Sequence, residues 1–409
     1  MIKTGSDFSG VGAFDQALDR LGITQDKIFA CDMDKYARQT YILNYGEPKY
    51  YPWNVYDREI PKESLDIYMT SPPCQSFSLA GKRKGEDSDN GVLFYNSHEF
   101  IQKNKPRYFI FENVKGLLSD DKANPKDKIG KTFRRWLDYL GGKSVNGNPV
   151  IFPHEESVPY HIYHKVINAK KCGVPQNRER VFIVGIRDDQ DNNFSWSKDI
   201  PLTKRLKDVL EENVDEKYYL SEKAINSIIL NPENIQPSKI NPDIAATIQS
   251  PGNACGIYKG MTAISVKSAT KKGFEVATEG DSINFSIPNS ETRRGRVGKE
   301  CAQTLDTVCN QGVFILGYTR DKKGKVIKRN PLNYSNTIHA STGGGGNTDQ
   351  FIRQQDYKIR RLTPLECFRL MDFNEDFKWD VSDTQAYRQA GNSIVVSCLV
   401  GIISKLKLS

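Results

Sequence analysis

Short runs of β-branched and aromatic residues alternate with helical patterns through the first 190 residues of the chain. Alternation at this spacing predicts a parallel sheet with helices on its faces. The predicted strands are Ile28–Cys31, Leu65–Met69, Tyr108–Glu112, Tyr163–Ala169 and Arg180–Arg187. The predicted helices are Ala13–Leu21, Lys35–Tyr45, Phe94–Lys103 and Thr132–Leu140.

The pattern changes between about Asp188 and Arg353, where helical periodicity fades after Ile229 and Gly, Asn, Ser and Thr become frequent. A weak repeat runs through this region, with copies at Ala246–Ser250, Gln303–Thr307 and Asn336–Ala340. Short strands joined by glycine-rich turns predict an irregular β-rich module. Helical patterning returns in the tail, over Thr363–Met371 and Ser393–Lys405.

Composition narrows the class of protein. The chain has 409 residues, of which 38% are hydrophobic and 26% charged, so it has enough length for one large or two medium soluble domains. No apolar run approaches the roughly 18 residues of a membrane span, and the N-terminus has no signal-peptide core. Eight scattered cysteines without a C-x-x-C pair indicate a reducing compartment rather than a disulfide framework or a zinc site. We therefore expect a cytoplasmic protein with no membrane partner and no metal.

The charge distribution is more informative than the net charge of +8. Residues 260–330 contain thirteen Lys or Arg against seven Asp or Glu, including the cluster Arg293-Arg294-Gly295-Arg296. A basic region of this kind suits a polyanionic partner. A solvated basic loop is the alternative, because most charge runs are exposed loops.

Cys74 follows a predicted strand, in the segment Ser71-Pro72-Pro73-Cys74-Gln75, and precedes a polar segment with Gly and Lys, Ser76–Gly91. Proline fixes its own φ and restricts the residue before it, so Pro72 and Pro73 limit where the sulfur can point. A thiol at a strand end beside a loop is well placed for nucleophilic attack. The alternative is a turn that contains a buried free cysteine, which usually behaves as a small hydrophobe.

The segment Phe8–Gly12 joins a predicted first strand to a helix. Its glycines allow a tight turn and a close approach of backbone N–H groups to a ligand, although a plain turn is the alternative. Asp32 ends the next strand, roughly 20 residues later, and an acidic residue there suits hydrogen bonds to ribose hydroxyls. The alternative for Asp32 is an N-cap of the helix that begins near Lys35, a role that Asp34 fits better.

Glu112 follows the apolar strand Tyr108–Phe111 and should face the same crevice as Cys74, because parallel strands end at one edge of the sheet. Arg178 and Arg180 come directly before the next strand with alternate spacing, so one face can carry both. An ordinary charge pair at a strand edge is the alternative.

Taken in order, these segments resemble the motifs of the DNA cytosine-5 methyltransferase family. The matching blocks are Phe8–Phe14, Ser71–Ser78, Phe111–Gly116, Gln176–Phe182, Arg361–Phe373 and Gln389–Val396. They are similar to the family's cofactor loop and to its Pro-Cys, Glu-Asn-Val, Gln-x-Arg-x-Arg, Leu-Thr-Pro-x-Glu-Cys and Gly-Asn-Ser motifs. The resemblance covers about residues 1–187 and 358–409.

The resemblance implies an α/β fold: the Rossmann-like sheet of S-adenosylmethionine-dependent methyltransferases with an inserted smaller, irregular β-rich target-recognition domain. Residues 1–187 would form the catalytic and cofactor-binding domain and residues 188–385 the recognition domain. Residues 386–409 would return as a helix to the catalytic domain.

The resemblance also implies a mechanism. The Cys74 thiolate would add to carbon 6 of a flipped cytosine, so that carbon 5 takes the methyl group of S-adenosylmethionine. Glu112 would bind ring nitrogen 3 and the exocyclic amine. Arg178 would bind the oxygen at position 2, and Arg180 would orient neighbouring groups.

Two further sets of residues follow from the resemblance. Those expected at the cofactor are Phe8, Ser9, Gly10, Gly12, Asp32, Met33, Asn54, Pro73, Leu93, Asn392 and Ile394. Those expected at DNA are Gln75, Ser78, Lys82, Arg83, Lys84, Gln176, Arg293, Arg294, Arg296, Thr304 and Leu305.

The chain departs from the family pattern around the cofactor loop. Asp7 stands where an apolar residue is common, Ser6 replaces the usual Asp, and Ala13 replaces a second glycine. Met33 stands where a bulkier stacking residue is frequent, and Asn54 stands where an acidic residue would contact the adenine amine.

The leading prediction is methylation of cytosine at a short site in double-stranded DNA by a bacterial or phage-type monomer. A cognate restriction endonuclease of the same system would be a partner without direct contact. A transfer-RNA cytosine-5 methyltransferase and a catalytically silent DNA-binding protein are the alternatives. The long basic recognition region favours duplex DNA, because reading several base pairs needs a large interface. A nicotinamide dehydrogenase is a distant third, since the chain lacks G-x-G-x-x-G in its cofactor loop.

Overall fold

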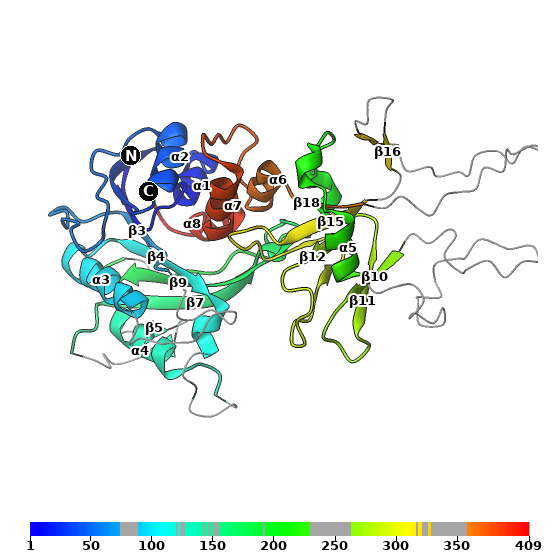
Figure 1. Ribbon diagram of the computed structural model, residues 1–409. Coiled ribbons are helices and arrows are strands. Elements are labelled where there is room, and N and C mark those ends of the chain that lie inside the picture. Colours follow the sequence, from blue (N-terminus) through cyan, green and yellow to red (C-terminus); the bar gives the residue numbers. More distant parts are fainter. Residues whose placement is uncertain are drawn as a thin grey trace, which may run out of the picture. The chain divides into compact units, whose positions relative to one another are not determined.

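The chain divides into two compact units (Figure 1). The first unit comprises Met1–Thr203 and Phe368–Ser409, and the second comprises Lys204–Cys367. The computed structural model describes residues 1–73, 89–119, 122, 127–141, 144–145, 148–149, 155–190, 193–229, 263–315, 318–320, 326–328 and 358–408. Among these residues no helix is long and apolar enough to cross a membrane, and no group of three or more His, Cys, Asp and Glu could hold a metal ion.

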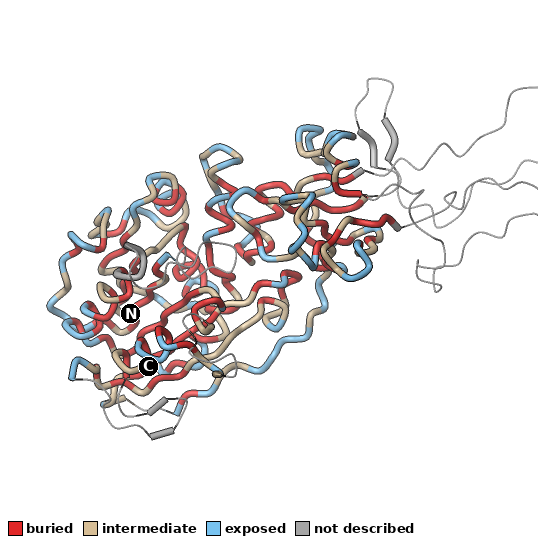
Figure 2. The backbone as a smooth tube through the Cα atoms, turned by 60° about the horizontal axis from the view of Figure 1, so that its bottom comes forward, coloured by how far each residue is buried: buried red, intermediate tan, exposed pale blue. Residues whose placement is uncertain are grey.

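An eight-stranded sheet forms the centre of the first unit, and its middle strands are buried along most of their length (Figure 2). In spatial order the strands are β2 (Gln25–Cys31), β1 (Ile2–Asp7), β3 (Ile67–Thr70), β4 (Tyr108–Val114), β9 (Glu179–Arg187), β7 (Tyr160–Asn168), β5 (Ser144–Val145) and β6 (Asn148–Pro149). The α/β class is therefore confirmed.

The prediction of a wholly parallel sheet is wrong at β9. Strands β2, β1, β3 and β4 run parallel, whereas β9 is antiparallel to both β4 and β7. The reason is the length of the connection. Only residues 169–178 join β7 to β9, and a parallel crossover needs about a dozen or more residues.

Helices cover the sheet and follow the predicted pattern closely in the N-terminal half. They are α1 (Ala13–Arg20), α2 (Lys35–Tyr45), α3 (Asp89–Asn104), α4 (Lys131–Leu140), α7 (Asp383–Asn392) and α8 (Val396–Ile403), with 3-10 turns η2 (Lys115–Ser119) and η3 (Ala169–Lys171). Helix α4 shows why the pattern works: Phe133, Trp136, Leu137 and Leu140 recur at helical spacing and are all buried. Helix α7 has no counterpart in the hydrophobic pattern, and α8 is shorter than the helix predicted over Ser393–Lys405. The single returning helix that the resemblance implied over residues 386–409 is two helices, α7 and α8.

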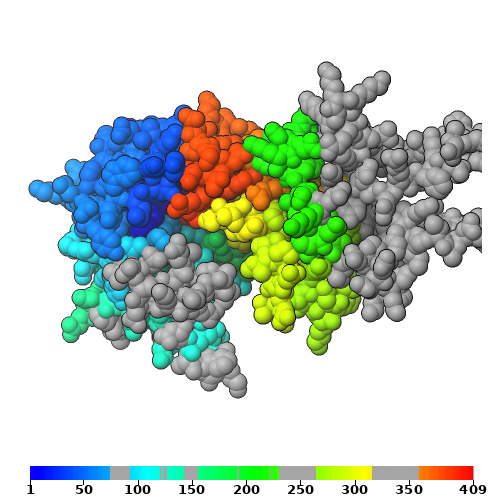
Figure 3. All heavy atoms as spheres, in the orientation of Figure 1, coloured from blue at the N-terminus to red at the C-terminus, as the bar shows by residue number. Residues whose placement is uncertain are grey.

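The C-terminal segment returns to the first unit earlier than expected. Asn44 of α2 donates its amide to the Lys378 carbonyl at 2.7 Å and accepts the Lys378 N–H at 3.0 Å. Gln39 of the same helix donates to the Asp380 carbonyl at 2.8 Å. In Figure 3 the orange and red surface of the C-terminal residues adjoins the blue surface of the N-terminal ones. Residues 368–385 therefore lie in the first unit and not in the recognition domain, where the sequence boundary of 188–385 had put them.

The second unit is built from short antiparallel strands around a small aliphatic core of Ile and Val with Phe314. A hairpin pairs β10 (Ala263–Lys267) with β11 (Phe274–Thr278). A second sheet has the order β13 (Val297–Gly298), β12 (Ser282–Asn284), β15 (Gln311–Ile315) and β18 (Lys358–Arg361). The second unit also contains β14 (Ala302–Gln303), β16 (Tyr318–Arg320), β17 (Val326–Lys328), η4 (Leu206–Val209), η5 (Glu216–Tyr218) and α5 (Glu222–Ile228). The short strand β8 (Gln176–Asn177) belongs to the first unit. Helix α6 (Pro364–Leu370) begins in the second unit and ends in the first.

The weak repeat falls only partly within the described residues. Its copy at Gln303–Thr307 overlaps the end of β14 and the turn that follows. The copies at Ala246–Ser250 and Asn336–Ala340 lie outside the described residues.

Candidate active site

The candidate site lies along the carboxyl edge of the parallel strands. Asp7, the last residue of β1, pairs in register with Cys31 of β2 on one side and with Thr70 of β3 on the other. Thr70 in turn pairs with Phe111 of β4. The residues that come next along each strand therefore share one edge: Phe8, Asp32, Ser71 and Glu112. This edge is where open α/β sheets bind ligands.

The turn after β1 requires glycine at Gly12. Its φ is 87°, and a Cβ there would lie 2.2 Å from the Tyr45 ring of α2. Gly10 also has a positive φ of 55°, but a Cβ there would meet nothing within 4 Å. The main chain of this turn is bonded to the end of β2, since Ser9 N–H donates to the Cys31 carbonyl at 3.0 Å. The turn therefore has a fixed conformation with backbone groups at the carboxyl edge.

The sequence left open whether Asp32 faces a ligand or caps α2, and the structure assigns the cap to Asp34. Asp34 caps α2, because its carboxylate accepts the N–H groups of Tyr36 and Ala37 at 2.9 and 3.2 Å, and this prediction is confirmed. Asp32 instead accepts the Gly10 and Asp34 N–H groups, each at 2.8 Å. Burial raises the pKa of the Asp32 carboxyl, against the effect of these two backbone donors. The carboxylate is thus held between the glycine turn and α2.

The other residues expected at the cofactor have varied surroundings. Met33 is 77% exposed beside Asp32, and Asn54 closes a turn by accepting the Tyr56 N–H at 3.0 Å. Leu93 and Ile394 are buried, whereas Pro73 and Asn392 are exposed. Three features of this edge fit a nucleoside-containing cofactor. They are a turn whose glycines have positive φ, a fixed carboxylate at the end of β2 and an exposed apolar side chain beside it.

Glu112 is a buried carboxylate at the end of β4, and Arg180 of β9 is its ion-pair partner. Arg180 Nε lies 3.2 Å from Glu112 Oε1. The register explains the contact, because Val114 pairs with Arg180, and Val114 and Glu112 face the same side of the strand. Burial raises the pKa of Glu112, and the positive charges of Arg180 and Arg178 offset only part of that rise. The site therefore favours a proton on Glu112 more than water does.

Arg178 has a different place from the one expected. Its guanidinium is buried, and Nη2 donates to the carbonyl oxygens of Gly391 and Ser393 at 3.1 and 2.8 Å. These contacts hold the backbone on both sides of Asn392. The structure thus makes Arg180 the arginine at Glu112, while Arg178 fixes the turn between α7 and α8. These contacts favour Arg180 rather than Arg178 as the arginine beside Glu112.

Cys74 lies outside the described residues, but the chain that leads to it is fixed at this edge. Asn113, the neighbour of Glu112, donates its side-chain amide to the Pro72 carbonyl at 3.3 Å. Sequence reasoning did not single out Asn113, although its place inside the Glu-Asn-Val block was a signal.

The residues expected at DNA divide into three groups. Gln75, Ser78, Lys82, Arg83 and Lys84 lie outside the described residues. Arg294 and Thr304 are exposed, Arg293 is half-buried, and Leu305 is buried.

For the polar side chains Gln176 and Arg296, burial contradicts the expectation. Gln176 is fully buried and donates to the Leu370 carbonyl at 2.9 Å, so it ties the chain before β9 to the end of α6. Arg296 is also buried, and its guanidinium donates to the carbonyl oxygens of Asn284, Ser286 and Ile287 at 3.0, 2.9 and 2.6 Å. Neither side chain is available to a base or a phosphate in this structure.

The chain is similar in sequence to known DNA methyltransferases. The sequence model for C-5 cytosine-specific DNA methylases matches residues 2–408. The orphan methyltransferase M.SPRI of Bacillus phage SPR is 29% identical, over 99% of this chain and 97% of that protein. The type II methyltransferase M.HpaII of Haemophilus parainfluenzae is 28% identical, over 96% of this chain and 85% of that protein.

Solved structures share the fold. The Dnmt2 methyltransferase of S. pombe superposes with a TM-score of 0.53 at 18% identity, covering 99% of this chain and 98% of that one. A putative DNA modification methyltransferase encoded within an E. coli prophage gives the same TM-score at 16% identity, covering 99% of each chain.

Proposed function

This chain belongs to the C-5 cytosine-specific DNA methylase family and is a DNA methyltransferase, and from that premise we propose the reaction in detail. It transfers a methyl group from S-adenosylmethionine to carbon 5 of cytosine at a short specific sequence in double-stranded DNA. The observation that carries this proposal is the buried Glu112, paired with Arg180 at the end of β4 beside the chain that leads to Cys74.

Nucleophilic catalysis begins at Cys74. The thiolate adds to carbon 6 of the flipped cytosine, and the electron pair of the 5,6 double bond makes carbon 5 nucleophilic. S-adenosylmethionine, when bound, supplies the electrophilic methyl group. After carbon 5 is methylated, a base removes its proton and the Cys74 sulfur leaves, which restores the double bond. The thiol needs local positive potential to ionise, since a free cysteine has a pKa near 8.5.

Glu112 and Arg180 stabilise the charge that builds up on the ring. A protonated Glu112 donates a hydrogen bond to ring nitrogen 3 and accepts one from the exocyclic amine, and its raised pKa supports this protonation state. We assign the oxygen at position 2 to Arg180, because Arg180 contacts Glu112 while Arg178 is bonded to backbone carbonyls. Arg178 acts by holding the turn that carries Asn392.

The carboxyl edge of β1 and β2 would hold the cofactor. The conformation of the Gly10–Gly12 turn and the carboxylate of Asp32 support this assignment, with Phe8 and Met33 as apolar contacts. Asp32 would accept hydrogen bonds from the ribose hydroxyls.

The target cytosine must be flipped out of the duplex before this chemistry can occur, at a cost of a few kcal/mol. Lys82, Arg83 and Lys84 remain predicted phosphate contacts, which position DNA without reading sequence. Arg293 and Arg294 remain candidates for base or phosphate contacts, since neither is buried in the second unit.

The test is transfer of tritiated methyl from S-adenosylmethionine to duplex DNA and to transfer RNA in parallel. We expect labelled 5-methylcytosine in DNA, none in RNA, and no transfer by Cys74→Ser. Duplex DNA containing 5-fluorocytosine should trap a covalent adduct with the parent protein. Label in transfer RNA alone would favour the RNA enzyme, and no label with intact DNA binding would favour a silent binding protein.

A further inference from the structure

A buried charge pair lies under the cofactor turn, at a position where the family commonly has an apolar residue. Asp7 is 1% exposed, and its carboxylate accepts the Arg58 Nε–H at 2.8 Å and the Tyr68 hydroxyl at 2.6 Å. Both partners are buried as well, at 7% and 0% exposure. Asp7 ends β1, and Phe8 follows it directly.

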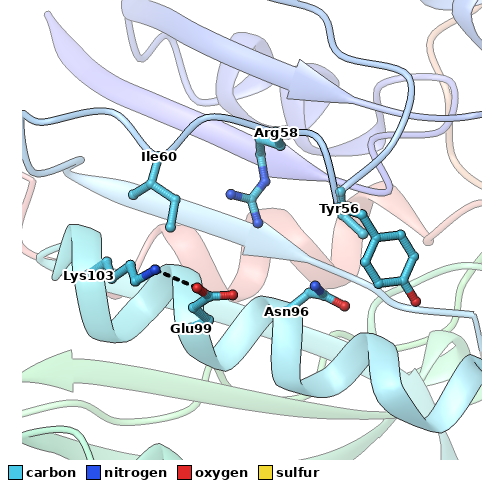
Figure 4. Close-up of a pocket in the computed structure, with 7 residues that line it drawn as sticks. Tyr56, Arg58, Ile60, Asn96, Glu99 and Lys103 are labelled. Carbon is cyan, nitrogen blue, oxygen red and sulfur yellow. Dashed lines mark hydrogen bonds and ion pairs between the residues drawn. The ribbon is translucent and has the colours of Figure 1, made fainter.

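Arg58 reaches this carboxylate from the segment between α2 and β3. Its guanidinium carbon lies 4.5 Å from the centre of the Phe100 ring. Figure 4 shows the side chain pointing toward α3, at a cavity of about 320 Å³ that Asn96 and Glu99 also line. The arginine is therefore held on two sides, by an aromatic ring and by Asp7.

Stability of the fold does not by itself require this pair. Replacing a buried ion pair by apolar residues of similar volume is often neutral or stabilising, because burial of two charges costs desolvation. The pair also occupies the Tyr68 hydroxyl. The side chains of Asp7, Arg58 and Tyr68 are three buried polar groups that converge on the end of β1. Since stability does not require them, their arrangement indicates that the chain must be held in a fixed position there.

The position that needs support is Phe8. Its φ is 56°, which is rare for a residue with a side chain, and such a conformation persists only where the surroundings impose it. On the C-terminal side Ser9 and Gly10 are bonded to Cys31 and Asp32. On the N-terminal side the anchor is the Asp7 carboxylate. Phe8 is thus fixed between two anchors, one of which depends on Arg58.

We propose that Arg58 is a positioning residue for the cofactor: through Asp7 it holds Phe8 in the left-handed conformation that presents its ring to S-adenosylmethionine. This inference rests on the proposed function, which assigns the turn to that cofactor. It predicts that Arg58 affects cofactor affinity while leaving DNA affinity unchanged.

The experiment compares the full chain with Arg58→Leu, Arg58→Lys and the double variant Asp7→Leu/Arg58→Leu. The readouts are the Kd of S-adenosylmethionine by calorimetry, KM for cofactor and for DNA, kcat and Tm. We expect Arg58→Leu to raise the Kd and KM of the cofactor about 10- to 100-fold, which is about 1.4 kcal/mol for each tenfold. KM for DNA and kcat at saturating cofactor should stay near the parent values, and Arg58→Lys should recover most of the affinity.

The double variant separates positioning from stability. Removal of both charges should restore Tm without restoring cofactor affinity. Arg107→Leu is the control, because Arg107 pairs with Asp66 at 2.9 Å at the start of β3 and β4, away from the cofactor turn, and we expect unchanged cofactor affinity from it.

Three results would overturn the inference. They are a folded Arg58→Leu protein with parental affinity, a double variant that regains affinity together with Tm, and an equal loss in Arg107→Leu. A parent chain that binds S-adenosylmethionine but methylates no cytosine would defeat the proposed function alone, since the binding series would still decide the role of Arg58. A parent chain that does not bind S-adenosylmethionine would defeat both.

Discussion

At the scale of single residues, the protonation state of Glu112 connects the structure to the chemistry. The carboxyl is buried, and its pKa is raised above the ordinary 4.5 because burial outweighs the charges of Arg180 and Arg178. A carboxylic acid that keeps its proton can donate to ring nitrogen 3, which an ionised one cannot.

Glu112→Gln keeps a neutral donor but cannot pass a proton to ring nitrogen 3, so kcat should fall about 100-fold or more, as loss of a general acid does, while DNA binding is retained. The same substitution should also change how the stability of the protein depends on pH. Because the folded pKa is raised, the parent loses stability as pH rises from 4.5 through that pKa, whereas glutamine does not titrate. Tm of the variant relative to the parent should therefore increase with pH across that window. A constant difference in Tm would contradict the raised pKa.

The two arginines should separate in a pair of variants. Arg180→Gln removes the partner of Glu112 and should lower kcat with little change in Tm. Arg178→Gln leaves the Gly391 and Ser393 carbonyls without their donor, which costs about 1–3 kcal/mol for each unsatisfied buried group. Thermal unfolding and single-turnover methyl transfer measured on both variants would check this, and a loss of kcat without a loss of Tm in Arg178→Gln would restore the original assignment.

The roles of single residues could be predicted from the sequence to different degrees. The sequence indicated that Asp34 would cap a helix, because Asp one residue before a helical run has a local effect. Alternate spacing of Arg178 and Arg180 indicated one shared face, but it contained no information on which arginine would meet Glu112. That choice depends on backbone carbonyls at residues 391–393, which are distant in sequence. The burial of Gln176 and Arg296 likewise depends on distant partners.

At the scale of elements, the turn between β1 and α1 provides a matched pair of glycines. Gly10→Ala should lower the free energy of unfolding by about 1–2 kcal/mol, because alanine disfavours the left-handed conformation but its Cβ would meet no neighbour. Gly12→Ala should cost that and a further ~1–3 kcal/mol, because its Cβ would overlap the Tyr45 ring. Denaturant titration of both variants measures the difference, and equal destabilisation would mean that the ring moves aside freely.

Strands and helices of the first unit were predictable because each has a local pattern that its burial later explains. The antiparallel direction of β9 was not, since direction follows from the length of the connection and not from the strand itself. Helix α7 was missed for another reason. Its buried residues are Ala386, Tyr387, Gln389, Ala390 and Gly391, a set with little hydrophobic contrast.

At the scale of the whole molecule, the first unit is discontinuous in sequence, and its ends meet at one place. Lys3 N–H donates to Asp66 at 2.8 Å, Asp66 pairs with Arg107, and the Tyr108 hydroxyl donates to the Lys407 carbonyl at 2.8 Å. The boundaries implied by the family resemblance, 188 and 385, lie outside the observed boundaries of the second unit, Lys204 and Cys367. Lys378 and Asp380 contact α2 through bonds between side chain and backbone, which have no hydrophobic pattern in the sequence.

The meeting of the termini leads to a prediction about connectivity. Lys3 and Lys407 contact residues at the start of β3 and β4, opposite the carboxyl edge that carries Glu112. The N and C marks lie near each other in Figure 1. A circular permutant that joins Ser409 to Met1 through a short Gly/Ser linker should therefore leave the site intact. New ends between Lys271 and Lys272 would open an exposed turn between β10 and β11.

We expect this permutant to fold with a Tm within a few degrees of the parent and to keep its kcat and its KM for S-adenosylmethionine. Any loss should appear in KM for DNA, because the opened turn belongs to the second unit and the cofactor residues belong to the first. A matched permutant opened between Lys35 and Tyr36 should fail, since it cuts the first turn of α2, where Asp34 accepts two backbone N–H groups. If the first permutant lost cofactor affinity, the second unit would contribute to methyl-donor binding as well.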